Sequence, residues 1–136
     1  MTASRGRLKL PFPDWEGPVG VFDWPIKLAS LDGERSLQLD AMVDTGSSYT
    51  IVPEGLLKSL GIAPTEKVGL TLADGRRVVW DVGEARATVD GRSTVTWVVF
   101  GEDGAHPLLG AYTLEGLRMS VNPWKHTLIP MPYGWA

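Results

Sequence analysis

The sequence predicts an all-β fold with one or two short helices. The chain has 16 glycines and 10 prolines among 136 residues, a share well above the roughly 12% of average usage. Such frequent turn residues suit many short strands joined by tight turns. Asp-Gly dipeptides stand between segments rich in β-branched residues, and Asp-Gly is a strong short-range signal for a hairpin.

The N-terminal part is expected to form an arm followed by a first hairpin. Prolines and glycines interrupt residues 1–18 and predict an irregular arm, so that residues 19–136 would form the folded domain. Residues 19–30 and 35–43 predict two strands around the Asp32-Gly33 turn. Alternate residues of the second strand are apolar and would share one face: Leu37, Leu39, Ala41 and Val43.

A short strand and a short helix are expected next. Residues 49–52 are β-type residues that follow a break in the chain. Residues 53–60 predict a helix, because Pro53 suits a first helical turn and Gly61 stands just past the expected end.

Two further hairpins are predicted in the middle of the chain. Residues 68–73 and 76–82 flank Asp74-Gly75, which fits a two-residue turn with positive φ at both central positions. Residues 84–90 and 93–100 form the third predicted hairpin, and its second strand is almost wholly β-branched or aromatic.

The C-terminal part is expected to contain a second short helix and a final strand. Leu108-Leu109-Gly110 precedes a helical candidate over residues 113–119. Residues 127–131 predict a last short strand. No repeat of solenoid period is visible in the sequence.

Composition excludes several classes of function. The formal net charge is −3 without a basic patch, which disfavours nucleic-acid binding. No apolar run reaches the roughly 18 residues of a membrane span, and neither a P-loop nor a GxGxxG motif is present. The chain has no cysteine, which suits a cytoplasmic location, and its two histidines lack metal-site spacing. We expect no metal and no organic cofactor.

The motif at Asp44 carries the most specific chemical signal. Asp44 follows an apolar strand, so its carboxylate is held by rigid structure. Thr45 and Gly46 follow, and the glycine allows a tight turn that brings a backbone N–H near the carboxylate. Ser47 and Ser48 add hydroxyls that can donate to it. Asp-Thr-Gly is also a common structural turn, and an unrelated β-barrel binding module with an ordinary turn here is one alternative.

The order of motifs resembles the retropepsin-like aspartic peptidases, the single-domain relatives of retroviral proteases. The resemblance covers about residues 19–130 and is carried by residues 42–48 and by Leu108-Leu109-Gly110. It implies an acid-protease barrel with a flap hairpin between these two motifs. The expected flap tip, which would contact substrate, consists of Ala73, Asp74, Gly75 and Arg76. Family flaps are often richer in glycine, and retroviral members usually have alanine at the position of Ser47.

The resemblance implies a homodimeric aspartic endopeptidase that acts on a peptide or protein substrate. This class uses two carboxylates that share one proton, and the chain has a single Asp-[Ser/Thr]-Gly motif. Two protomers would therefore each supply Asp44 as the catalytic residue, supported by Thr45, Gly46 and Ser47. By the same resemblance, Thr45 would bond across the two-fold axis, and the chain termini would form the interface, with these candidate residues: Trp15, Met131, Tyr133 and Trp135. The alternative is a non-proteolytic member of the fold that serves as a dimerisation or peptide-binding module.

Overall fold

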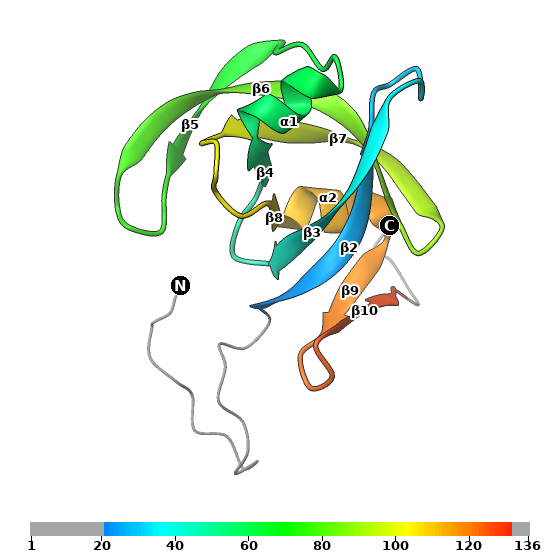
Figure 1. Cartoon of the computed structure of the whole chain (residues 1–136). Coiled ribbons are helices and arrows are strands. Elements are labelled where there is room, and N and C mark those ends of the chain that lie inside the picture. Colours follow the sequence, from blue (N-terminus) through cyan, green and yellow to red (C-terminus); the bar gives the residue numbers. More distant parts are fainter. Residues whose placement is uncertain (1–20, 132–136) are drawn as a thin grey trace.

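The computed structural model describes residues 21–131 as a β-barrel with two short helices and a separate two-stranded sheet (Figure 1). The expected arm over residues 1–18, Trp15, Tyr133 and Trp135 lie outside the described residues. The elements are, in chain order, β2 (Val21–Ala29), β3 (Ser36–Asp44), β4 (Thr50–Pro53), α1 (Glu54–Ser59), β5 (Glu66–Thr71), β6 (Arg77–Val89), β7 (Arg92–Gly101), β8 (Leu108–Leu109), α2 (Ala111–Leu117), β9 (Met119–Asn122) and β10 (Thr127–Pro130).

The barrel closes because β2, the first strand of the main sheet, also pairs with β6 near the other end of the sheet. The seven strands run in the order β2-β3-β8-β4-β7-β6-β5, and β2 also pairs with β6. This second pairing joins Lys27–Ala29 to Arg86–Thr88. It leaves β5 outside the ring, paired only with β6. The expectation of an all-β barrel with short helices is confirmed.

The first hairpin sets the orientation of the site. In β2 and β3, Phe22 pairs with Val43 and Leu28 pairs with Leu37, so alternate residues of both strands face the core. The predicted apolar face of β3 is therefore correct. The other face carries Asp44, which pairs with Val21 at the open end of the hairpin.

One strand replaces two that the sequence suggested. Residues 76–82 and 84–90 were expected as separate strands, but β6 runs unbroken for 13 residues through Gly83. A Cβ at Gly83 would lie 2.7 Å from the carbonyl oxygen of Ala63. The glycine therefore permits close packing within a strand, and the interpretation that it ends a strand was wrong.

The three hairpin turns differ although each contains Asp-Gly. At the third turn, Asp90 and Gly91 have φ of 50° and 84°, as a two-residue turn requires. At the second, only Gly75 has positive φ, and the Leu72 N–H donates to the Arg76 carbonyl at 2.8 Å. The expected two-residue turn at Asp74-Gly75 is therefore wrong: the loop has three residues, with the glycine in the left-handed position.

Both helices are close to their predicted places. α1 begins at Glu54, directly after Pro53 ends β4. α2 begins at Ala111, two residues before the predicted start, and it ends where Arg118 adopts a left-handed conformation with φ of 56°. Met119, which was expected in the helix, instead opens β9, and β9 pairs with β10. Within residues 21–131, no helix is long and apolar enough to span a membrane.

Candidate active site

Asp44 is the last residue of β3 and stands at the rim of the barrel. Val43, directly before it, is fully buried, and successive strand residues point to opposite faces. The Asp44 side chain is consequently turned away from the core and is half-buried. β3 lies between β2 and β8, so the carboxylate is positioned by the middle strand of three.

The turn after Asp44 orients its carboxylate. The Gly46 N–H donates to Asp44 Oδ1 at 2.9 Å, and the Ser47 N–H donates to the Asp44 carbonyl at 3.1 Å. A Cβ at Gly46 would lie 3.2 Å from the same Oδ1, a distance that would crowd the carboxylate. Glycine at this position therefore keeps the short N–H···O contact free of a side chain. Thr45 lies at the tip of the turn and is exposed.

Ser47 supports the loop in a different way from the one expected. Its Oγ donates to the Tyr49 carbonyl at 2.9 Å. A hydroxyl carries one proton, so this bond uses the proton that was expected to reach Asp44. The interpretation of Ser47 as a donor to the carboxylate is corrected: in this structure its side chain fixes the shape of the loop.

The Leu108-Leu109-Gly110 segment brings the start of α2 onto this loop. The Ala111 N–H donates to the Ser47 carbonyl at 2.7 Å, and the Tyr112 N–H donates to the Ser48 carbonyl at 3.0 Å. A Cβ at Gly110 would collide with the Tyr49 carbonyl. Only glycine allows this approach, which explains why an apolar pair followed by glycine accompanies the Asp-Thr-Gly motif in this chain.

Three buried threonines lie behind the loop. Thr113 Oγ1 of α2 is 2.6 Å from Thr50 Oγ1 of β4 and 2.8 Å from Thr96 Oγ1 of β7. The Gly110 N–H donates to Thr50 Oγ1 at 3.1 Å, which joins the residue before α2 to the network. All three threonines are buried. The sequence does not reveal this cluster, because its members come from three elements and none of the threonines belongs to a recognisable sequence motif.

The expected flap tip is exposed and makes few long-range contacts. Ala73, Asp74, Gly75 and Arg76 are all exposed at the end of the β5–β6 hairpin, which extends to one side of the barrel (Figure 1). The Arg76 N–H donates to Asp74 Oδ1 at 2.9 Å, and Arg76 Nε donates to Asp74 Oδ2 at 2.8 Å. The backbone N–H and then the guanidinium of Arg76 lower the pKa of Asp74. Arg76 also reaches Glu102 at 3.4 Å.

His106 has an acidic partner that the sequence did not reveal. Its Nε2 lies 2.9 Å from Asp23 Oδ1 of β2, although the two residues are 83 positions apart. Among residues 21–131, no group of three or more histidine, aspartate or glutamate side chains is placed to hold a metal ion.

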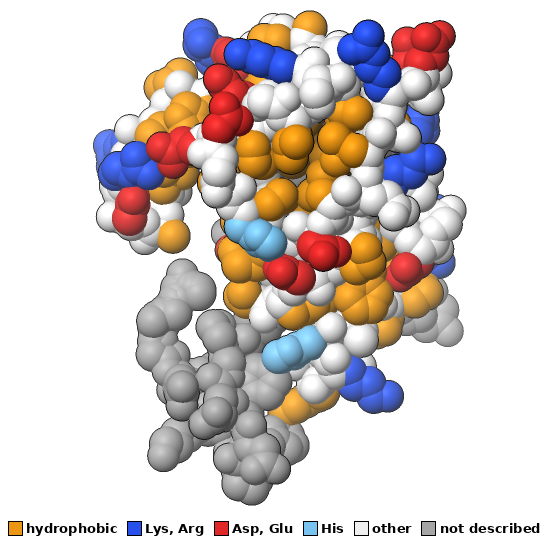
Figure 2. All heavy atoms as spheres, viewed as in Figure 1, with side chains coloured by type: hydrophobic (Ala, Val, Ile, Leu, Met, Phe, Trp, Pro, Cys, Tyr) orange, Lys and Arg blue, Asp and Glu red, His pale blue; other side chains and the backbone are white. Residues whose placement is uncertain are grey.

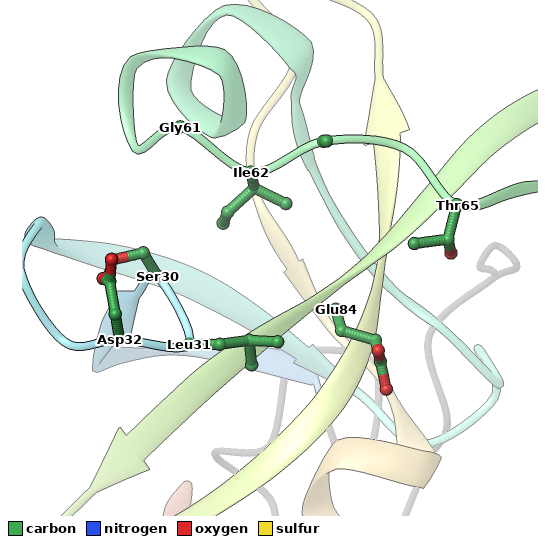
Figure 3. A pocket seen from close by; sticks show the side chains of 8 residues that line it. Ser30, Leu31, Asp32, Gly61, Ile62, Thr65 and Glu84 are labelled. Carbon is green, nitrogen blue, oxygen red and sulfur yellow. The ribbon is translucent and has the colours of Figure 1, made fainter.

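A pocket of about 400 Å³ lies away from Asp44 (Figure 3). Leu31 of the β2–β3 loop and Ile62 after α1 line it from two sides, and Glu84 of β6 lines it from a third. Because Asp44 is at the other end of the β2–β3 hairpin from this loop, the pocket does not include the candidate catalytic residue.

The chain was compared with protein families, with curated sequences and with solved structures. The family model described as gag-polyprotein putative aspartyl protease matches residues 30–116, which is more than half of the chain. Among solved structures, the chain is similar to the solution structure of Simian Foamy Virus (mac) protease, with 22% identity over 68% of this chain and 92% of that chain and a TM-score of 0.47. No curated protein sequence matches the chain significantly. The matched residues include both the Asp-Thr-Gly loop and the Leu-Leu-Gly segment, and the chain belongs to the gag-type, retropepsin-like aspartyl protease family.

Proposed function

We propose that the chain is a homodimeric aspartic endopeptidase in which each protomer supplies Asp44 to one shared site. The observation that carries the proposal is the oriented Asp44 carboxylate, held by the Gly46 N–H at 2.9 Å at the end of a barrel strand. Membership of an aspartyl protease family supports the same assignment.

The need for two carboxylates argues for a dimer. The sequence contains one Asp-[Ser/Thr]-Gly motif, so a single protomer has one such carboxylate. A two-fold axis beside the loop would bring the same residue from each copy together, as in any isologous interface. Thr45 is exposed at the tip of the turn and is suitably placed to bond across that axis. Met131 directly follows β10, its N–H donates to the Arg118 carbonyl at 2.9 Å, and it is a candidate interface residue.

Two carboxylates in contact would activate water directly. Like charges this close cannot both ionise, so the pair holds one proton. The ionised Asp44 takes a proton from a water as the water oxygen attacks the peptide carbonyl carbon. The protonated Asp44 gives its proton to the carbonyl oxygen, which produces a neutral tetrahedral diol. The Asp44 that accepted the water proton then gives it to the amide nitrogen, while the other Asp44 takes a proton from one diol hydroxyl. The C–N bond breaks, and an amine and a carboxylic acid leave.

The β5–β6 hairpin is suited to cover an extended peptide. Its tip, Ala73 to Arg76, is exposed. β5 is the last strand of the main sheet and pairs on one side only, with β6, among residues 21–131. An extended peptide pairs with strand edges through its main chain, and neighbouring side chains then set its preference. Closure of such a hairpin over the site would exclude water from the reaction.

A cleavage assay with a matched inactive protein tests the proposal. The wild-type protein is incubated with a diverse peptide library at several pH values, with and without a transition-state-mimicking aspartic protease inhibitor. We expect inhibitor-sensitive cleavage by the wild-type protein and none by Asp44→Asn. Activity per chain should also fall on dilution below the dimer dissociation constant.

Two outcomes would contradict the proposal. Cleavage by Asp44→Asn at the wild-type rate would remove Asp44 from the mechanism, and an active monomer in sedimentation would remove the shared site. Peptide binding without cleavage at any pH would favour the alternative, a peptide-binding module of the same fold.

A further inference from the structure

The face of the sheet that carries Asp44 also carries a row of half-buried and exposed side chains. Asp23 of β2 is the register partner of Met42, and Met42 is the partner of Leu108 in β8. Register partners point to the same face of a sheet. Since Val43 is fully buried on the core side, Asp23, Met42, Asp44 and Leu108 share the outer face.

The Asp23–His106 pair crosses this face. His106 precedes β8 and Asp23 lies on β2, so the 2.9 Å contact between Nε2 and Oδ1 passes over β3. The loop that carries His106 is itself held to β3, because the Met42 N–H donates to the Pro107 carbonyl at 2.8 Å. The pair is accessible, since the two side chains are 52% and 55% exposed. Figure 2 shows both histidines of the chain on one face, with acidic side chains between them.

The pair lies close to the candidate catalytic residue. Asp23 is opposite Met42, two positions before Asp44, and two residues of a strand span about 7 Å. The contact with His106 uses Oδ1 of Asp23, whereas Oδ2 has no hydrogen bond within residues 21–131. A carboxylate accepts several hydrogen bonds, so Asp23 is held on one oxygen and open on the other.

The surrounding charges favour a cationic group. Asp40 lies on the same outer face, where it is the register partner of Pro25. Lys27 is the basic residue of β2, two positions beyond Pro25 and further from Asp44. Met42 and Leu108 are half-buried, and they form an apolar strip beside Asp23 on the face that carries Asp44.

We propose that Asp23, positioned by His106, is a specificity-determining residue that selects a lysine or arginine side chain of the bound peptide. The aliphatic part of such a side chain would cover Met42 and Leu108 while its charged end reaches Asp23 Oδ2. This inference rests on the proposed role of the Asp44 face in binding a peptide, and it adds the chemistry of one preferred side chain.

Cleavage of decapeptides randomised at every position tests the proposal. Sequencing of the products gives the enrichment of lysine and arginine at each position relative to the cut. We expect enrichment at one position by the wild-type protein and a loss of about tenfold in Asp23→Asn, the order of a hydrogen bond to a charged group. The control Asp40→Asn removes one charge from the same face, but two positions further from Asp44, and it should reduce the enrichment much less than Asp23→Asn does. Equal enrichment in Asp23→Asn and wild type, or none in wild type, would overturn the proposal.

Two further measurements separate this inference from the proposed function. The same library is bound to immobilised Asp44→Asn protein, with and without Asp23→Asn, so that selection is measured without hydrolysis. Retention of basic peptides that depends on Asp23 supports the inference even where no cleavage occurs. Cleavage without a preference for basic side chains overturns the inference and leaves the proposed function standing. His106→Ala should weaken the preference and His106→Gln should restore part of it, because glutamine can still donate to Asp23. An unchanged preference in His106→Ala would remove the positioning role.

Discussion

The Asp44 loop and the flap tip have the same local hydrogen bond but differ in their contacts with the rest of the barrel. In both, an aspartate Oδ1 accepts the N–H of the residue two positions later at 2.9 Å, Gly46 in one and Arg76 in the other. The Asp44 loop is then bonded to the start of α2, and the residue before α2, Gly110, is bonded to the buried threonine cluster. The flap tip has no buried residue at positions 72–77, and its contact beyond the hairpin is the exposed ion pair of Arg76 with Glu102.

This difference separates a fixed group from a movable one. Long-range hydrogen bonds to buried partners hold a loop in one conformation, because opening it would leave those partners unpaired. Exposed ion pairs contribute little, about 0–1 kcal/mol, and break easily. A proposed catalytic carboxylate on the first loop and a proposed cover on the second are consistent with these two kinds of support.

The largest effect is expected for the carboxylate of Asp44. Asp44→Asn should lower cleavage by several decades, since each general acid or base contributes roughly 10²–10⁴-fold and the change removes both. Asp32→Asn is the matched control, because the Glu34 N–H donates to Asp32 Oδ1 at 3.0 Å in a similar turn at the far end of the hairpin. kcat/KM of both variants on one peptide gives the answer, and similar losses in the two would contradict a special role for Asp44.

The next largest effect is expected where α2 meets the Asp44 loop. Gly110→Ala places a Cβ against the Tyr49 carbonyl, and we expect the free energy of unfolding to fall by about 3 kcal/mol, the upper end for overpacking. Gly75→Ala meets no atom within 4 Å, but φ is +91°, so the loss should be about 1 kcal/mol of backbone strain. Denaturant unfolding of both variants measures the difference. A larger loss for Gly75→Ala would reverse the comparison.

A smaller loss is expected in the threonine cluster. Thr113→Val leaves Thr50 and Thr96 without their shared partner, and burial of an unpaired hydroxyl costs about 1–3 kcal/mol. Thr88→Val breaks the exposed Thr88–Ser93 contact of 2.7 Å and should cost less than about 0.5 kcal/mol. Thermal unfolding of the two variants tests this order, and equal stabilities would show that the buried cluster does not support the loop.

The smallest effect concerns the pH dependence of the flap tip. The Arg76 N–H lowers the pKa of Asp74 from its ordinary value of 3.8. A depressed folded-state pKa contributes stability above the unfolded value, and that stability is lost as the pH falls through the folded value, here below 3.8. The tip should therefore stay unchanged between neutral pH and about pH 5 and loosen only in stronger acid.

NMR titration of the Asp74 carboxyl measures its pKa directly. Arg76→Ala removes the guanidinium but keeps the backbone N–H, so the pKa of Asp74 should rise part of the way to its ordinary value. A pKa that did not change in Arg76→Ala would assign the whole shift to the backbone.

Features that depend on neighbouring residues could be predicted from the sequence, and features that join distant residues could not. The first hairpin, both helices within two residues of their starts, and the Asp44 and Leu108-Leu109-Gly110 motifs follow from local patterns. Gly83 was taken as a strand end because its local signal does not show that Ala63 packs against it. The threonine cluster and the Asp23–His106 pair join segments far apart in the chain, and single threonines or histidines give no sign of such partners.

The continuity of β6 has a mechanical consequence. Residues Arg77–Val82 pair with β5 in the flap, whereas Val82–Val89 pair with β7 in the barrel wall. A force on the flap tip is therefore transmitted along one unbroken strand to Val82 and Gly83, where the pairing of β6 with β7 in the barrel begins. Gly83 has no side chain and lies against the Ala63 backbone, so the strand is supported at this point. The flap part of β6, Arg77–Val82, can therefore change in length or sequence while Val82–Val89 keeps the barrel closed.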